Sequence, residues 1–116
     1  MFEIIFEDIR KKIDSIISIG VWGIDGLELE NYIVNDSRID YELYGAEVAD
    51  VLKATYAIKD SLDSVLIKIN YKKKVLVLLP VNEDFFYMVF AEGDVLLSKL
   101  EFYLRLYKDD VLDKIS

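Results

Sequence analysis

The feature that most constrains this chain is a pair of strand-like segments that are apolar on both faces. Residues 75–79 have the sequence Val-Leu-Val-Leu-Leu, and residues 85–90 have the sequence Phe-Phe-Tyr-Met-Val-Phe. Successive side chains of a strand point to opposite faces of a sheet, so neither segment leaves a polar face for water. An antiparallel sheet with one solvated face alternates apolar and polar residues instead. Both faces of these strands must therefore be covered by other elements.

A third strand precedes this pair, at 65–70, after a turn at 61–64. The connections at 72–74, which is three lysines, and at 82–84 are short, so the three strands are predicted to be antiparallel neighbours. Charge runs are usually solvated, and a solvated turn is one interpretation of the lysines. A small contact patch for an acidic partner is the other.

Isoleucines at helical spacing predict an amphipathic N-terminal helix of about four turns that ends near Gly20, a residue type that favours helix C-termini. These residues are Ile5, Ile9, Ile13, Ile16 and Ile17. Two strands, at 21–24 and 27–34, are then predicted to form a hairpin across a two-residue Asp25–Gly26 turn, because both positions of such a turn favour positive φ. Glu28 and Glu30 on the second strand are typical of an exposed sheet edge.

Two further helices complete the predicted fold. The middle helix runs from Tyr41 to Lys59, with Asp40 as its N-cap, and the last begins at about Asp94. The last helix has a predicted inner stripe of Leu96, Leu100, Tyr103, Leu104, Tyr107 and Val111. The predicted fold is an α/β (α+β) sandwich in the order α-β-β-α-β-β-β-α, a single domain over residues 1–116 whose five-stranded antiparallel sheet has helices on both faces.

Three helices are too few to cover both faces of five strands. With the first and last helices on one face, the middle helix alone covers the other. A helix is about 10 Å wide and strands lie about 4.8 Å apart, so one helix covers about two strands. The same helix of a second copy is the simplest cover for the remaining strands.

The middle helix has a predicted sheet-facing stripe of Tyr44, Val48, Val51, Leu52 and Thr55, and its other side carries small residues that would let another helix approach. Asp50 and Lys53 there could pair reciprocally across a two-fold axis, and the strand at 65–70 could pair with its own copy. The predicted dimer interface is Gly45, Ala46, Ala49, Asp50, Lys53, Tyr56, Ala57, Val65, Ile67 and Ile69. The alternative interpretation is a solvated face whose alanines serve helix propensity.

Composition argues against several classes of function. The net charge of −8 disfavours nucleic acid, and the chain contains no histidine and no cysteine, so the common nucleophile–base pairs cannot be built. No phosphate-binding loop motif is present. The acidic clusters are predicted to be solvated: Asp25, Glu28 and Glu30; Asp60 and Asp63; Asp109, Asp110 and Asp113. We therefore expect a protein that is not an enzyme, with no catalytic residue, cofactor or metal.

The sequence also carries no targeting signal that we recognise. No apolar run reaches the roughly 18 residues that a membrane-spanning helix needs, and the N-terminus lacks the features of a signal peptide. A cytoplasmic location is the default expectation.

The predicted order of elements resembles the Roadblock/dynein light chain family over almost the whole chain. The resemblance rests on Gly20–Leu29, with a glycine-containing first strand and a D-G turn, and on Glu42–Ala49 in an alanine-rich second helix. The closing strand–helix pair, 85–90 and 94–106, also fits. The first hairpin is more compact than in many members. The resemblance implies the Roadblock/profilin-like fold, and a homodimer or a heterodimer with a paralogue, with second helices packed antiparallel and third strands joined.

The resemblance further implies a partner among Ras-like small GTPases, as for the bacterial gliding and polarity regulators, or a scaffold role. Members of that type stimulate GTP hydrolysis without an arginine finger, and no motif surrounds Arg10, Arg38 or Arg105 that argues otherwise. Two alternatives remain open. One is a small-ligand sensor whose pocket is lined by Trp22, Tyr32 and Tyr87, although large aromatics more often lie in the core. The other is a structural subunit of a larger assembly.

Overall fold

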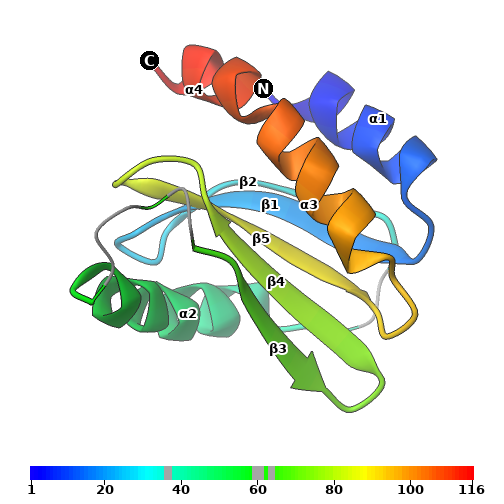
Figure 1. Cartoon of the computed structure of the whole chain (residues 1–116), viewed down its shortest axis with the longest axis horizontal. Coiled ribbons are helices and arrows are strands. Elements are labelled where there is room, and N and C mark those ends of the chain that lie inside the picture. The colour runs from blue at the N-terminus through cyan, green and yellow to red at the C-terminus, as the bar shows by residue number, and fades with distance from the viewer. Residues whose placement is uncertain (36–37, 59–61, 63–64) are drawn as a thin grey trace.

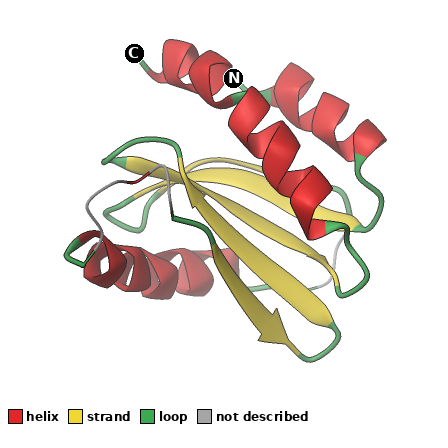
Figure 2. Ribbon diagram, in the orientation of Figure 1, coloured by secondary structure: helices red, strands yellow, loops and turns green. Residues whose placement is uncertain are grey.

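The protein is described by a computed structural model that covers residues 1–35, 38–58, 62 and 65–116. Its elements are α1 (Glu3–Lys12), β1 (Ile16–Gly23), β2 (Glu28–Ile33), α2 (Tyr41–Tyr56), β3 (Ile67–Tyr71), β4 (Lys74–Pro80), β5 (Phe85–Glu92), α3 (Leu97–Leu106) and α4 (Lys108–Ile115). The five strands form one sheet in the order β2-β1-β5-β4-β3, and every neighbouring pair is antiparallel. Figure 2 shows this sheet between two layers of helix.

The helices divide unevenly between the two faces of the sheet. Figure 1 shows α1, α3 and α4 on one face and α2 on the other, with no further helix among the described residues on that face. Each face has its own apolar core. The core under α1 and α3 includes Phe2, Phe6, Tyr87, Leu100 and Leu104, and the core under α2 includes Trp22, Leu52, Phe86, Met88 and Phe90. The predicted class and the predicted split of helices are confirmed.

The first helix is shorter than its isoleucine spacing predicts. The helix ends at Lys12, and Ile16–Gly23 form β1, so the prediction of a helix up to Gly20 was wrong. Ser15 has a positive φ of 77°, which interrupts the helical path. β1 lies between β2 and β5 and is buried along its whole length. A strand covered on both faces shows no polar alternation, so periodicity cannot separate it from a buried helix.

The β1–β2 hairpin differs from the predicted two-residue turn. Four residues, 24–27, connect the strands, and Gly26 has a positive φ of 87° whereas Asp25 does not. The Gly23 N–H donates to the Leu27 carbonyl at 2.8 Å, and the Leu27 N–H donates to Asp25 Oδ1 at 3.0 Å. The side chain of Asp25 thus stabilises a longer loop, in which only one position needs glycine.

The predicted bounds of β2, β3, β4 and β5 and the predicted start of α2 agree closely with the structure. Asp40 caps α2, because its Oδ1 accepts from the Leu43 N–H at 3.2 Å. The last helix does not agree. The predicted last helix is two helices, α3 and α4, separated at Tyr107, whose ψ of 2° is not helical. Leu96, placed on the inner stripe by its spacing, precedes α3 and is 67% exposed. α2 ends at Tyr56, so the predicted end of the middle helix at Lys59 was wrong. The predicted turn at 61–64 falls largely outside the described residues.

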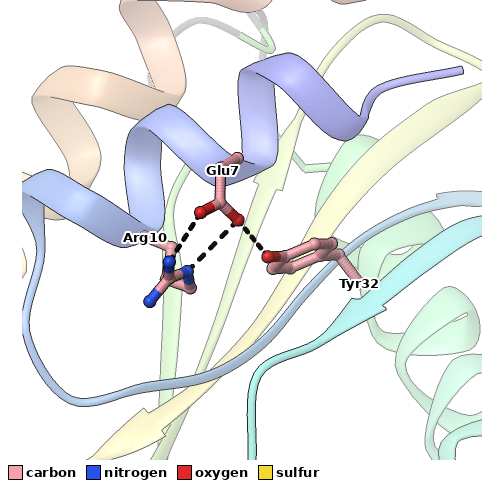
Figure 3. Close-up of polar contacts among 3 residues, drawn as sticks. All are labelled: Glu7, Arg10 and Tyr32. Carbon is pink, nitrogen blue, oxygen red and sulfur yellow. Dashed lines mark hydrogen bonds and ion pairs between the residues drawn. The ribbon is translucent and has the colours of Figure 1, made fainter.

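Two carboxylates of α1 attach this helix to distant parts of the chain. Glu7 accepts from Arg10, with Nη2 and Oε1 2.6 Å apart, and from the hydroxyl of Tyr32 on β2 (Figure 3). Asp8 accepts from Lys12 at 2.8 Å and from the hydroxyl of Tyr107, between α3 and α4. These contacts fix α1 to the β2 edge on one side and to the C-terminal helices on the other.

The hydrogen bonds to Glu7 predict a specific acid response. The bonds from Arg10 and then Tyr32 lower the pKa of Glu7 from 4.5 to about 2. A carboxyl group with a lowered folded-state pKa stabilises the fold above its unfolded pKa, and this contribution is lost as the pH falls through the folded pKa. Glu7→Gln should therefore lower the free energy of unfolding at neutral pH and flatten its decline between about pH 4.5 and 2. Urea unfolding across this range measures both effects.

The matched control is Glu3→Gln, an exposed glutamate at the start of the same helix. This variant keeps Glu7, so its free energy of unfolding should decline between about pH 4.5 and 2 as in the wild type. An unchanged decline in Glu7→Gln would contradict the assigned role.

Candidate interaction surface

The rotation of α2 about its own axis decides which of its residues are available to a partner. The buried residues of α2 are Gly45, Val48, Ala49 and Leu52, a spacing that places them on one helical face. A Cβ added at Gly45 would lie 2.4 Å from a ring carbon of Trp22. The indole of Trp22 therefore lies directly against the backbone of α2, and only glycine leaves room for it.

Three residues of the predicted dimer interface are buried within the chain, two on the buried face of α2 and one just before β3. Gly45 is covered by Trp22, while Ala49 and Val65 are each 2% exposed and belong to the core beneath α2. They offer no surface to a second copy in this conformation. Small residues on a helix allow close approach of an aromatic ring as well as of another helix, and the sequence alone does not distinguish the two.

Four other predicted interface residues lie on the exposed side of α2 or just beyond its end. Ala46, Asp50, Lys53 and Ala57 are exposed. Lys53 Nζ lies 4.0 Å from Asp50 Oδ1 in the same helix, so this pair already forms within one chain. The hairpin loop also reaches this helix, since a Cβ at Gly26 would lie 3.1 Å from the Cα of Ala46.

The other three predicted interface residues are half-buried. Ile67 and Ile69 lie on β3, pair with Leu78 and Leu76 of β4, and pack against the core beneath α2. Tyr56 lies at the end of α2, where burial raises the pKa of its hydroxyl to about 12. β3 pairs only with β4 and forms one edge of the sheet. Its isoleucines therefore lie at the border between the core and the surface.

An apolar groove of about 240 Å³ separates α2 from β3. Tyr44 and Val51 of α2 line one side, and Ile69 and Tyr71 of β3 line the other. The rings of Tyr44 and Tyr71 are 6.3 Å apart in an edge-on arrangement. Val51 is 43% exposed, so its assignment to the sheet-facing stripe was wrong. The contact between Trp22 and Gly45 rotates the helix and turns Val51 toward the groove.

Further large apolar side chains extend this surface along α2. Leu43 near the start of the helix and Ile58 just after its end are both exposed. Leu43 also lines a second hollow beside Tyr44 and Tyr71. With the groove, these residues are a candidate for a contact with another protein, since exposed apolar patches commonly mark such contacts. We call the set Leu43, Val51, Ile58, Ile69 and Tyr71 the α2–β3 surface.

A wider hollow of about 600 Å³ runs along α1, next to Glu3, Ile4 and Tyr32. Two of the carboxylates that line it, Glu7 and Asp8, already accept hydrogen bonds from side chains of this chain. Glu3 and Lys11 also line the hollow, so most of its lining is charged, whereas the α2–β3 groove is lined mainly by apolar side chains. We regard the α2–β3 surface as the better candidate for a protein contact, because exposed apolar patches commonly mark such contacts.

The three aromatics of the predicted sensor pocket do not meet. Trp22 and Tyr87 are buried in separate cores on opposite faces of the sheet, and Tyr32 donates to Glu7. The prediction that these residues line one pocket was wrong. Trp22 and Tyr87 are core residues, and Tyr32 attaches β2 to α1 through its hydrogen bond to Glu7.

The described residues contain no group of three acidic side chains placed to hold a metal ion. Asp60 and Asp63 lie outside the described residues. None of their helices is long and apolar enough to span a bilayer.

Comparison with known proteins identifies the fold. No family profile matches the sequence, and no curated protein matches it significantly. Solved structures do match. The Roadblock/LC7 domain of Streptomyces avermitilis has a TM-score of 0.77 at 11% identity, covering 96% of this chain and 94% of that one. The chain has the Roadblock fold.

Two proteins of bacterial gliding systems, MglC and MglB, have the same fold. MglC of Myxococcus xanthus has a TM-score of 0.66 at 20% identity, covering 97% of this chain and 98% of that one. MglB of the same organism has a TM-score of 0.77 at 10% identity, covering 97% and 92%. Another similar MglB structure is described as having a tetrameric arrangement. Profilin IA of Acanthamoeba castellanii is similar too, with a TM-score of 0.63 at 7% identity, so the Roadblock fold alone does not select a function.

The contact between Trp22 and Gly45 gives a direct test of how α2 sits in this Roadblock fold. Gly45→Ala should lower the free energy of unfolding by on the order of 1 kcal/mol, because overpacking costs about 1–3 kcal/mol and exceeds the roughly 1 kcal/mol that alanine gains over glycine in a helix. Denaturant unfolding measures the change.

Lys53→Ala, on the exposed side of the same helix, is the matched control and should change stability by less than about 0.5 kcal/mol. Stabilisation by Gly45→Ala would show that nothing lies against this position and would contradict the rotation described.

Proposed function

We propose that this chain is a non-catalytic, dimeric protein-interaction module of the cytoplasm that regulates or scaffolds a Ras-like small GTPase. The observation that carries the proposal is the α2–β3 surface. It combines exposed apolar side chains with an adjacent sheet edge, on the face of the sheet where a single helix is the only cover among the described elements.

In the proposed dimer, α2 packs antiparallel against α2 of a second copy, and the two β3 strands join into one continuous sheet. Pairing of β3 removes an edge whose isoleucines would otherwise favour uncontrolled association. The contact uses Val51, Ile69 and Tyr71 together with Ala57, in place of the buried Gly45, Ala49 and Val65. A paralogue with a similar surface could replace the second copy.

The small GTPase is proposed from the combination of fold and surface. MglB and MglC share the fold, and the sequence resembles the bacterial gliding and polarity regulators of the Roadblock family. The GTPase would dock on the paired α2 helices and the adjoining loops. Because the chain has neither histidine nor cysteine, we propose that it acts by positioning groups of the GTPase rather than by supplying a catalytic residue.

The test is a titration of purified protein into small GTPases of the Ras-like class loaded with GTP. We expect binding that is weaker to the GDP-loaded form, together with a changed rate of GTP hydrolysis for a regulator or an unchanged rate for a scaffold. Val51→Glu should weaken the binding, since it places a charge in the α2–β3 groove. Ile4→Glu, at an 84% exposed residue of α1, is the matched control and should bind normally.

Absence of binding to every GTPase, with hydrolysis unaffected, would overturn the proposal and favour a structural subunit. A small molecule that copurifies with the protein would favour a sensor instead.

A further inference from the structure

The sheet has a second edge, β2, which the proposed dimer does not use. The Val34 N–H donates to the Ile17 carbonyl at 2.8 Å, and β2 pairs with β1 in antiparallel register. Hydrogen bonds alternate along such a pair, so the N–H and C=O groups of Asn31 and Ile33 point away from β1. These groups form a row that another extended chain could pair with.

The side chains of β2 differ between the two faces of the sheet. On the face of α1, Glu30 accepts from the Met1 amine at 2.8 Å and from the Phe2 N–H at 2.6 Å, and Tyr32 donates to Glu7. On the other face, Ile33, which pairs with Ser18, is 52% exposed. Leu29 lies at the shift in register between Glu30 and Glu28 and is 37% exposed. The α1 face of β2 is thus occupied by contacts within the chain, whereas Ile33 and Leu29 leave apolar surface beside the row of backbone groups.

A groove of about 290 Å³ lies at the hairpin end of β2, and Leu29 is among the residues that line it. Leu27, Leu29 and Phe85 supply its apolar lining, and the carboxylates of Glu28 and Asp84 lie at it. The backbone is fixed here, because the Ile24 N–H donates to the Asp84 carbonyl at 2.8 Å. No lysine or arginine is among the residues that line this groove, and within the described part of the chain neither Glu28 nor Asp84 forms an ion pair.

We propose that the β2 edge binds an extended basic segment of another protein. The segment pairs with the outward groups of Asn31 and Ile33 as a sixth strand and packs an apolar side chain on Leu29 and Leu27. Its lysine or arginine residues lie next to Glu28 and Asp84. Local charge selects this occupant over a second copy of the chain, because pairing two β2 edges would bring Glu28 and Asp84 of one copy close to the same carboxylates of the other.

The probe for this site is a synthetic heptapeptide that alternates lysine and valine, capped at both ends and labelled for fluorescence anisotropy. We expect saturable binding that weakens as salt rises, and slower hydrogen exchange of the Asn31 and Ile33 amides in the complex. The double variant Glu28→Lys and Asp84→Lys should bind about tenfold more weakly, a change of about 1.4 kcal/mol. Leu27→Ser, which keeps all charges, should also weaken binding.

The matched control is Asp109→Lys with Asp113→Lys, on exposed positions of α4, which changes the net charge by the same amount and should leave binding nearly unchanged. Three results would overturn the proposal. The first is equal binding of a peptide that alternates glutamate and valine. The second is exchange protection on β3 instead of β2. The third is protection of the β2 amides by raised protein concentration alone, which would make a second copy the occupant. None of these results bears on the GTPase titration.

Discussion

β1, β4 and β5 are the three inner strands of the sheet, and almost every side chain on them is buried on one face or the other. Fully burying a large apolar side chain contributes roughly 1.5–3 kcal/mol, so leaving either face open would cost the chain most of its stability. Covering both faces therefore governs the arrangement of the helices. Three helices cover one face, and α2 covers the other with the backbone at Gly45 lying against Trp22.

The two outer strands follow from the same constraint in different ways. β3 lies beside the single helix, so its isoleucines border an apolar groove that one copy of the chain leaves open. β2 lies beside the layer of three helices, where Glu30 and Tyr32 are engaged by the first residues and by α1. Ile33 on the opposite face of β2 and Leu29 at its shift in register stay exposed. We therefore propose a second copy of the chain as the partner of the β3 edge and a basic segment of another protein as the partner of the β2 edge.

Elements that depend on local residue patterns could be predicted from the sequence. Features that depend on contacts between distant residues could not. The uninterrupted apolar segments at 75–79 and 85–90 predicted a sheet covered on both faces, and Asp40 predicted the start of α2. The start of β1 could not be predicted, because Ile13, Ile16 and Ile17 keep helical spacing although the chain changes direction at Ser15. The rotation of α2 could not be predicted either, since it depends on Trp22, more than 20 positions away, meeting Gly45. With Trp22 against Gly45, Gly45 and Ala49 are buried in the core, and Val51 is exposed rather than facing the sheet.

We propose that a second copy of the chain completes the cover on the face of α2. Sedimentation equilibrium of the full chain decides whether it does. We expect a mass twice that of one chain for the wild type, a monomer for Val51→Glu, and a dimer for Ile4→Glu. A folded wild-type monomer at all micromolar concentrations would contradict the claim, as would a Val51→Glu variant that remains a dimer.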